Sequence, residues 1–209
     1  VMKDRQTLKE KIYNQIIDGI VSGEYKSGQI LNEKELVDRY DVSKAPVREA
    51  LLILSSEGVL TNIPRYGYRV ISFTLEDVAD IIEFPSAMEH YVLVKGFSRI
   101  QKADIQEMQR MLDADGQKDC DVWQHWDINE NFHLKLASFA ENHYIYEQLR
   151  KAMDFLKLAY AQFYWSQWNS TSIPNDLKNH SRILEALDEH DLELARLYLK
   201  RDLKDFCMK

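Results

Sequence analysis

Residues 33–58 contain two short amphipathic helical patterns separated by a turn at residues 41–43, and this stretch constrains the fold most. In the second pattern, apolar residues follow the i, i+3, i+4, i+7 spacing from Val47 to Leu54, typical of a helix buried along one face. Pro46 falls in its first turn, where a missing N–H costs little. The opposite face begins with Ser43, a favourable N-cap, and continues with Lys44, Ala45 and Arg48. Such a helix suits a DNA major groove, so the stretch predicts a helix-turn-helix.

A short β-hairpin is predicted directly after this motif. Residues 60–63 and 68–70 read as strands, with a turn at residues 64–67 between them. Gly67 permits a backbone bend and a close approach that a side chain would hinder. Arg65 and Tyr66 stand near the tip, from which Arg65 can reach a phosphate or the minor groove. A two-stranded wing after a recognition helix predicts a winged helix over residues 1–72.

Charge is distributed unevenly along the 209 residues, whose net charge is −7. Residues 1–72 carry 11 Lys and Arg against 10 Asp and Glu, a balance of +1, so residues 73–209 carry −8. A balanced first part with cations at one helix end is compatible with DNA binding, which needs a local patch. No apolar run suits a membrane span or a signal peptide, so we expect a cytoplasmic protein without membrane association. Two cysteines are too few for a disulfide framework.

From residue 75 onward the chain reads as helices throughout. Helical periodicity marks six stretches, at residues 75–99, 102–116, 121–140, 143–168, 175–189 and 191–207. Strand alternation is absent, so residues 73–209 are predicted to form an antiparallel six-helix bundle. Pro85 lies inside the first stretch and should kink or split that helix. The predicted fold class is therefore mainly α.

Residues 8–70 resemble the DNA-binding domain of the GntR family of bacterial transcription regulators. The resemblance is carried by VSKAPVREAL at residues 42–51, together with Gly23, Gly28, Leu31, Glu57, Gly58 and Gly67. It implies a double-stranded DNA operator contacted by the recognition helix and the wing, through Lys34, Ser43, Lys44, Ala45, Arg48, Arg65, Tyr66 and Gly67. The family more often has Arg at the position of Lys44. Because lysine cannot make the planar fork to guanine, base reading should depend on Arg48.

The helical part resembles the FCD ligand-sensing domain of the FadR-type branch of this family, in its short six-helix form. The similar segments are residues 76–93, 129–142 and 180–202. Such domains commonly bind a divalent metal on one Asp and three His, sense a small organic acid or similar metabolite, and usually dimerise. The resemblance therefore implies a homodimer on a palindromic operator, acting as a repressor whose DNA affinity a small molecule controls.

The resemblance places a metal site at Asn129, His133, His180 and Asp202. Asn129 stands where the family has Asp, and Asp202 stands where its third His normally lies. Two imidazoles, one carboxylate and one amide oxygen suit a divalent cation such as Zn, Ni or Mn. The alternative is that these groups line a metal-free cavity for an acyl compound or another metabolite. Pro85 stands where the family often has an Arg that pairs with an anionic effector, which puts a carboxylate effector held that way in doubt.

An enzymatic role is the remaining alternative. A di-iron enzyme in a helical bundle would need two Glu-x-x-His pairs, and Glu130 with His133 supplies just one. The sequence also lacks a nucleophile elbow and a P-loop. These observations favour a regulator over a metal-dependent enzyme.

Overall fold

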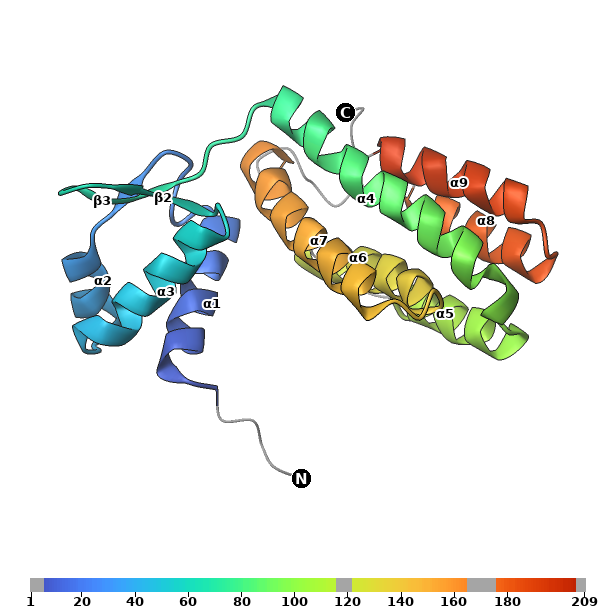
Figure 1. Cartoon of the computed structure of the whole chain (residues 1–209), viewed down its shortest axis with the longest axis horizontal. Helices are drawn as coiled ribbons and strands as arrows, with labels where there is room; N and C mark the ends of the chain where they lie inside the picture. Colours follow the sequence, from blue (N-terminus) through green and yellow to red (C-terminus); the bar gives the residue numbers. More distant parts are fainter. Residues whose placement is uncertain (1–5, 116–121, 165–175, 206–209) are drawn as a thin grey trace. The chain divides into compact units, whose positions relative to one another are not determined.

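The computed structural model describes residues 6–115, 122–164 and 176–205 (Figure 1). The chain divides between Thr74 and Leu75 into two compact units, with Lys157–Trp165 grouped with the first. The predicted helix boundaries at residues 116, 121, 168, 175 and 207, and both cysteines, lie outside the described residues.

The first unit is built from three helices and a three-stranded antiparallel sheet. The helices are α1 (Leu8–Val21), α2 (Glu33–Tyr40) and α3 (Lys44–Ser56), and the strands are β1 (Ile30–Leu31), β2 (Leu60–Ile63) and β3 (Gly67–Val70). A reciprocal capping box between Thr7 and Glu10 begins α1. Ile12 and Ile16 of α1 pack with the apolar stripe of α3 in the core of this unit. That stripe is the one predicted from the 47–54 spacing.

The turn between α2 and α3 has the geometry of a helix-turn-helix. Asp41 ends α2 in the left-handed region, at φ 50°, which short polar residues tolerate. Ser43 occupies the N-cap position of α3 with extended backbone angles, as predicted. Its side chain makes no capping hydrogen bond, so the hydroxyl is available at the exposed start of the helix.

The sheet of the first unit contains one strand besides the two of the predicted wing. β1 pairs with β3, with Leu31 opposite Tyr68, and the strand order is β1-β3-β2. The predicted hairpin is confirmed as β2 and β3, and β1 was not predicted because a two-residue strand is too short to show an alternating pattern. Gly67 is required here: a Cβ at this position would lie 2.4 Å from the carbonyl oxygen of Leu31.

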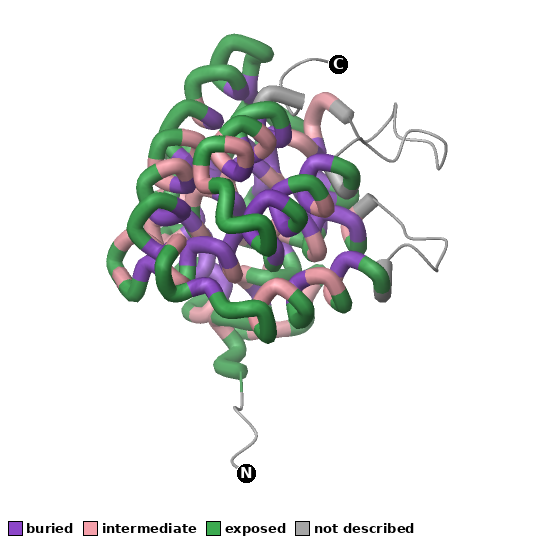
Figure 2. Tube along the Cα trace, turned by 90° about the vertical axis from the view of Figure 1, so that its right-hand side faces the viewer, coloured by how far each residue is buried: buried purple, intermediate pink, exposed green. Residues whose placement is uncertain are grey.

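The second unit is all-helical over the residues that the structure describes. Its helices are α4 (Leu75–Gly96), α5 (Lys102–Asp115), α6 (Val122–Ser138), α7 (His143–Tyr164), α8 (Asp176–Asp188) and α9 (Leu192–Asp205), with a 3₁₀ turn at Phe97–Arg99. Buried positions recur every three to four residues along these helices (Figure 2). Their side chains form one large apolar cluster that includes Leu93, Met108, Phe132, Ile183 and Leu199. The mainly α fold class is thus confirmed.

α4 runs through Pro85 as one helix (Figure 1), so of the two predicted effects of this proline, a kink or a split, the split does not occur. Pro85 is buried on the same face as Val78 and Ile82 before it and Val92 after it. Packing on both sides of the proline holds the helix together despite the lost hydrogen bond. Farther along, Gly96 allows α4 to approach the chain just after α6 closely, since a Cβ there would lie 2.8 Å from Phe139. Among the described helices, none is both long and apolar enough to cross a membrane.

Candidate functional sites

The predicted DNA-contacting residues lie at the start of α2, the start of α3 and the tip of the wing. Lys34, Ser43, Lys44, Ala45, Arg48, Arg65 and Tyr66 are all exposed, and Gly67 is partly buried. The Lys44 ammonium lies 3.2 Å from a carboxylate oxygen of Glu33, so this cation is partly neutralised in the free protein. Arg48 makes no ion pair with any described residue. Of these two cations, Arg48 is therefore the one whose charge no described acidic residue offsets.

The wing tip holds Arg65 in an unusual backbone conformation. The Tyr66 N–H donates to the Ile63 carbonyl at 3.0 Å, which closes a tight turn with Pro64 at its second position. Arg65 occupies the third position at φ 71°, where glycine or asparagine is the usual residue. Tyr66 follows at 69% exposure. The turn therefore projects a cation and an aromatic ring into solvent at a cost in backbone strain.

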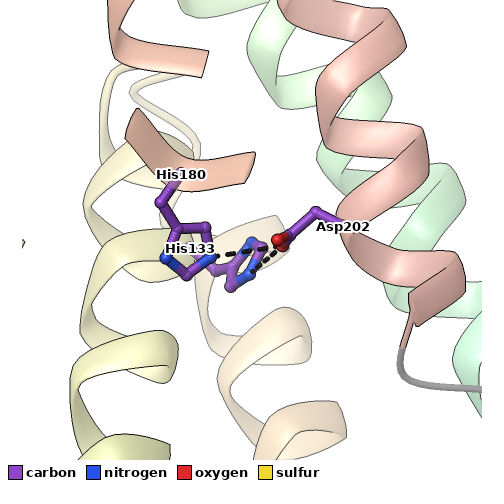
Figure 3. A group of neighbouring side chains, drawn as sticks. All are labelled: His133, His180 and Asp202. Atoms are coloured by element: carbon purple, nitrogen blue, oxygen red, sulfur yellow. Dashed lines mark hydrogen bonds and ion pairs between the residues drawn. The ribbon is translucent and has the colours of Figure 1, made fainter. Parts of the chain in front are cut away.

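A cluster of polar side chains lies inside the second unit. His133, His180 and Asp202 are fully buried, and Asn129 and Glu89 are almost so. They come from four helices: α4 provides Glu89, α6 provides Asn129 and His133, α8 provides His180 and α9 provides Asp202. Figure 3 shows both imidazoles turned toward the Asp202 carboxylate. Buried ionisable groups at such density need partners, protons or a ligand to offset their lost hydration.

The cluster converges on one oxygen atom. The Oδ2 atom of Asp202 lies 3.1 Å from Nε2 of His133 and 3.2 Å from Nε2 of His180. On the other side of the His133 ring, Nδ1 lies 2.6 Å from Oε2 of Glu89. The Phe132 ring stacks on His180 with centroids 4.0 Å apart, which fixes that imidazole plane. One potential ligand atom from each of His133, His180 and Asp202 falls within 4.8 Å of the others, a separation that one metal ion can span.

The two carboxylates decide the charge state of the cluster. Burial on its own lowers the pKa of His133, but Glu89 and Asp202 outweigh it and raise that pKa to about 10. Burial on its own raises the pKa of Asp202, but the charge of His180 and hydrogen bonds from both imidazoles hold it well below its usual range. Without a bound cation, a proton on His133 therefore offsets part of the negative charge.

Several buried polar atoms of the cluster have no protein partner. They are both side-chain amide atoms of Asn129, Oε1 of Glu89, Oδ1 of Asp202 and Nδ1 of His180. Such atoms are rare in folded proteins and usually pair with a ligand, an ion or a water. Asn129 precedes His133 by one helical turn and so shares its face of α6. The donor set of imidazole nitrogens and carboxylate and amide oxygens fits a divalent cation.

Three of the four predicted metal ligands thus come together, and the fourth is buried beside them on the same helix. Sequence reasoning missed Glu89. The signal was present, because Glu89 interrupts the buried apolar stripe that α4 shows at Val78, Ile82, Pro85 and Leu93. An acidic residue at a core-facing helical position needs a buried partner, and here that partner is His133.

Comparisons with known proteins agree with both units. A family model described as "Bacterial regulatory proteins, gntR family" matches residues 8–70, and an FCD domain model matches residues 80–205. The chain is 24% identical over 203 residues to the HTH-type transcriptional regulator YdhC of Bacillus subtilis (strain 168), covering 94% of this chain and 88% of that protein. It is 27% identical over 198 residues to the gluconate operon transcriptional repressor of Bacillus licheniformis, covering 89% of this chain and 78% of the repressor.

Among solved structures, Escherichia coli McbR/YncC has the same fold, with a TM-score of 0.76, 22% identity, and coverage of 95% of this chain and 94% of that one. The family matches together span both units, and the proteins of this family are DNA-binding regulators and not enzymes. The chain therefore belongs to the gntR family of bacterial regulatory proteins, and it is a transcriptional regulator that joins a winged-helix DNA-binding unit to a ligand-binding FCD domain.

Proposed function

We propose that this regulator represses transcription by binding a palindromic operator as a homodimer, and that a small metabolite and a divalent cation in the buried cluster control this binding. The observation that carries the proposal is the convergence of His133, His180 and Asp202 within 4.8 Å in the FCD domain. Repression is extended to this chain from the gluconate operon transcriptional repressor of Bacillus licheniformis, to which it is similar. Because its operator would be bacterial DNA, we place the protein in the cytoplasm.

The proposed recognition of DNA follows from the exposed ends of α2 and α3 and from the wing. Arg48 would read bases in the major groove, where its guanidinium can donate twice to guanine. Lys34, Lys44 and Arg65 would contact phosphates, or for Arg65 the minor groove, and fix the position of the helix. A twofold-symmetric dimer places two such helices about 34 Å apart in successive major grooves, which is why we expect a palindromic site.

In the proposed metal site, Nε2 of each histidine and a carboxylate oxygen of Asp202 would hold the ion, together with the Asn129 amide oxygen. Glu89 would accept the Nδ1–H of His133 and so keep Nε2 as the nitrogen that is free to bind an ion. When bound, Zn, Ni or Mn would supply positive charge to an anionic metabolite. That charge matters because no lysine or arginine falls among the buried described residues, and Pro85 occupies one of the core-facing positions of α4.

A metal-free sensor is the second candidate, and one contact favours it. The Oδ2 atom of Asp202 already lies within hydrogen-bond distance of a nitrogen on each histidine, so protons can hold the cluster together. In that case the unpartnered Asn129 amide and Glu89 oxygen would bind the metabolite directly.

The test starts from protein purified without chelator. We expect native mass spectrometry to show one divalent ion per chain, and we expect its removal to change the affinity for an operator selected from random double-stranded DNA. His133→Ala and Asp202→Ala should lose the ion but keep the helical circular dichroism spectrum. His190→Ala is the matched control, because this exposed histidine lies outside the cluster. Protein that binds no ion, yet responds to a metabolite in a His133-dependent way, would establish the metal-free sensor instead.

A further inference from the structure

Two guanidinium groups lie against the same aromatic ring on the surface of the helices α8 and α9. Figure 1 shows these helices side by side, and their residues contact one another. The guanidinium carbon of Arg182, on α8, lies 5.5 Å from the centre of the Tyr198 ring, and that of Arg201, on α9, lies 5.6 Å from it. Both arginines are exposed, and Tyr198 is partly buried. Because an aromatic ring attracts a cation placed over it, Tyr198 holds both guanidinium groups in place.

Within the described part of the chain, no acidic residue pairs with these two cations. Lys178, four residues before Arg182 on the exposed face of α8, has no ion pair with a described residue either. Glu185 follows Arg182 by three residues but makes no ion pair with it. Three other arginines of this unit each pair with a carboxylate: Arg99, Arg150 and Arg196. Arg182 and Arg201 repel each other as like charges, and a bound anion would remove that repulsion.

An apolar side chain lies beside the cations. Leu197 is 44% exposed and precedes Arg201 by four residues, so the two side chains are neighbours on α9. Among the described residues of α8 and α9, Leu197 is the one large hydrophobic side chain that is exposed. We call this surface the arginine patch; it consists of Lys178, Arg182, Leu197, Tyr198 and Arg201. Arginine and tyrosine are enriched among the residues that contribute most to protein–protein binding.

The charge of the unit restricts what can bind the arginine patch. Residues 73–209 carry −8, so a long polyanion such as DNA is repelled by the acidic residues of this unit. Contacts to a DNA backbone also depend on cations and hydrogen-bond donors, and they gain nothing from an exposed leucine. A short protein segment brings fewer charges and can place a carboxylate and an apolar side chain next to each other. A guanidinium group binds a carboxylate through two parallel hydrogen bonds.

We propose that the arginine patch binds an acidic segment of another protein, in which aspartate and glutamate stand beside apolar residues. Carboxylates of this segment pair with Arg182 and Arg201, and an apolar side chain packs against Leu197 and Tyr198. Lys178 adds a third positive charge on α8. This contact uses neither the buried cluster nor the DNA-contacting surface, so it adds a protein partner to the proposed function.

Three synthetic peptides test the chemistry of the partner. A short fluorescein-labelled peptide of aspartate, glutamate and leucine should bind the full chain in an anisotropy titration at low salt, and added salt should weaken this binding. A peptide with asparagine and glutamine in place of the acidic residues should not bind. A peptide with serine in place of leucine should bind roughly tenfold more weakly, because it loses the apolar contact. If the acidic leucine peptide does not bind, or if the three peptides bind equally, the proposal is wrong.

Substitutions in the arginine patch test its location. Arg182→Gln and Arg201→Gln should each weaken binding of the acidic leucine peptide roughly tenfold, and Arg201→Lys should retain part of the affinity because it keeps the charge but not the planar fork. Arg110→Gln on α5 is the matched control, since Arg110 is exposed and has no ion pair with a described residue. Circular dichroism checks folding, and operator affinity should be the same in all variants. Peptide binding that persists in both glutamine variants would overturn the proposal, and so would a loss of operator affinity in them, which would make the patch a DNA contact.

Discussion

The two carboxylates beside His133 favour a positive charge at this imidazole, whether it is a proton or a metal ion. Glu89 lies against Nδ1 and Asp202 against Nε2, and together they raise the pKa of this buried imidazole to about 10. Near neutral pH the metal-free imidazole is therefore protonated on both nitrogens. A metal ion needs the lone pair of Nε2, so it must displace that proton. Proton and ion compete for the same position.

This competition predicts that ion binding strengthens as pH rises toward about 10, with release of close to one proton per ion near neutral pH. In metal-free protein the same group contributes stability that is complete below its ordinary pKa of 6.5 and is lost as the pH rises through about 10. The thermal midpoint of metal-free protein should therefore fall over that window, while metal-loaded protein should not show the fall. Calorimetric titration in buffers of different ionisation enthalpy counts the protons. Glu89→Gln is the informative variant, since it removes one of the two carboxylates; proton release unchanged in that variant would contradict the account.

Arg48 is the residue on which base reading should depend. Arg48→Ala is expected to cost about 1–3 kcal/mol of operator binding and to relax the preference at one base position. Arg48→Lys keeps the charge but removes the planar fork, so it should lose the preference while retaining more of the affinity. Lys34→Ala should instead weaken binding to all sequences alike. Competition anisotropy with operator and scrambled DNA separates these effects. Unchanged operator binding by Arg48→Ala would contradict the prediction that α3 lies in the major groove.

The sequence was more informative about the candidate metal ligands than about the residues that contact them. His133, His180 and Asp202 could be proposed together because the resemblance to the FCD domain relates segments of three separate helices to one shared site. Glu89 could not be added, because its contact with His133 depends on how α4 packs against α6, over a separation of 44 residues. A helical periodicity shows which face is buried, but it does not show which helix covers that face.

At the scale of elements, the turn of the wing combines exposed side chains with local backbone strain. Arg65 adopts φ 71° at the turn, a region that costs a side-chain-bearing residue about 1–2 kcal/mol relative to glycine. Nothing in the fold requires arginine there, since its side chain is exposed. A strained, exposed cation beside the exposed Tyr66 is better explained by contact with DNA than by folding.

Substitutions at this turn should therefore separate stability from DNA binding. Arg65→Gly and Arg65→Ala should weaken operator binding equally, since both remove the cation. Arg65→Gly should be the more stable of the two by about 1 kcal/mol, because glycine adopts the positive φ without strain. Chemical denaturation measures the difference in unfolding free energy, and anisotropy measures binding. Unequal binding by the two variants would mean that the turn's conformation, and not the charge, is what DNA contacts.

The elements that could be predicted are those with long, regular patterns. The helix-turn-helix, the β2–β3 hairpin and the six helices of the second unit all carry periodicity over several residues. β1 has two residues and exists because β3 offers it an edge, which is a tertiary cause. The continuity of α4 through Pro85 is tertiary as well. A proline costs an isolated helix about 3 kcal/mol, and buried contacts before and after it offset that cost here.

At the scale of the whole molecule, regulation requires that the buried cluster and the DNA-contacting surface influence one another. The cluster is buried among helices of the second unit, whereas the predicted DNA-contacting residues belong to the first unit. Any control must then be a coupling free energy, typically about 1–3 kcal/mol, which corresponds to a change of about 5- to 150-fold in operator affinity. Coupling of this kind is reciprocal, because the same four states are reached by either order of binding.

Reciprocity gives a test that needs no knowledge of the metabolite. Loading the cluster with Zn or Mn should change operator affinity by a factor within that range, and saturating operator should change the affinity for the ion by the same factor in the same direction. Anisotropy gives the first factor and calorimetric titration with and without operator gives the second. His133→Ala should bring both factors to one while preserving the operator affinity of metal-free protein, because the substitution lies in the second unit. If the ion binds tightly and both factors equal one in the unmodified protein, the ion stabilises the FCD domain without regulating DNA binding. A metabolite alone would then control transcription, since a ligand that binds both conformations equally does not shift the equilibrium between them.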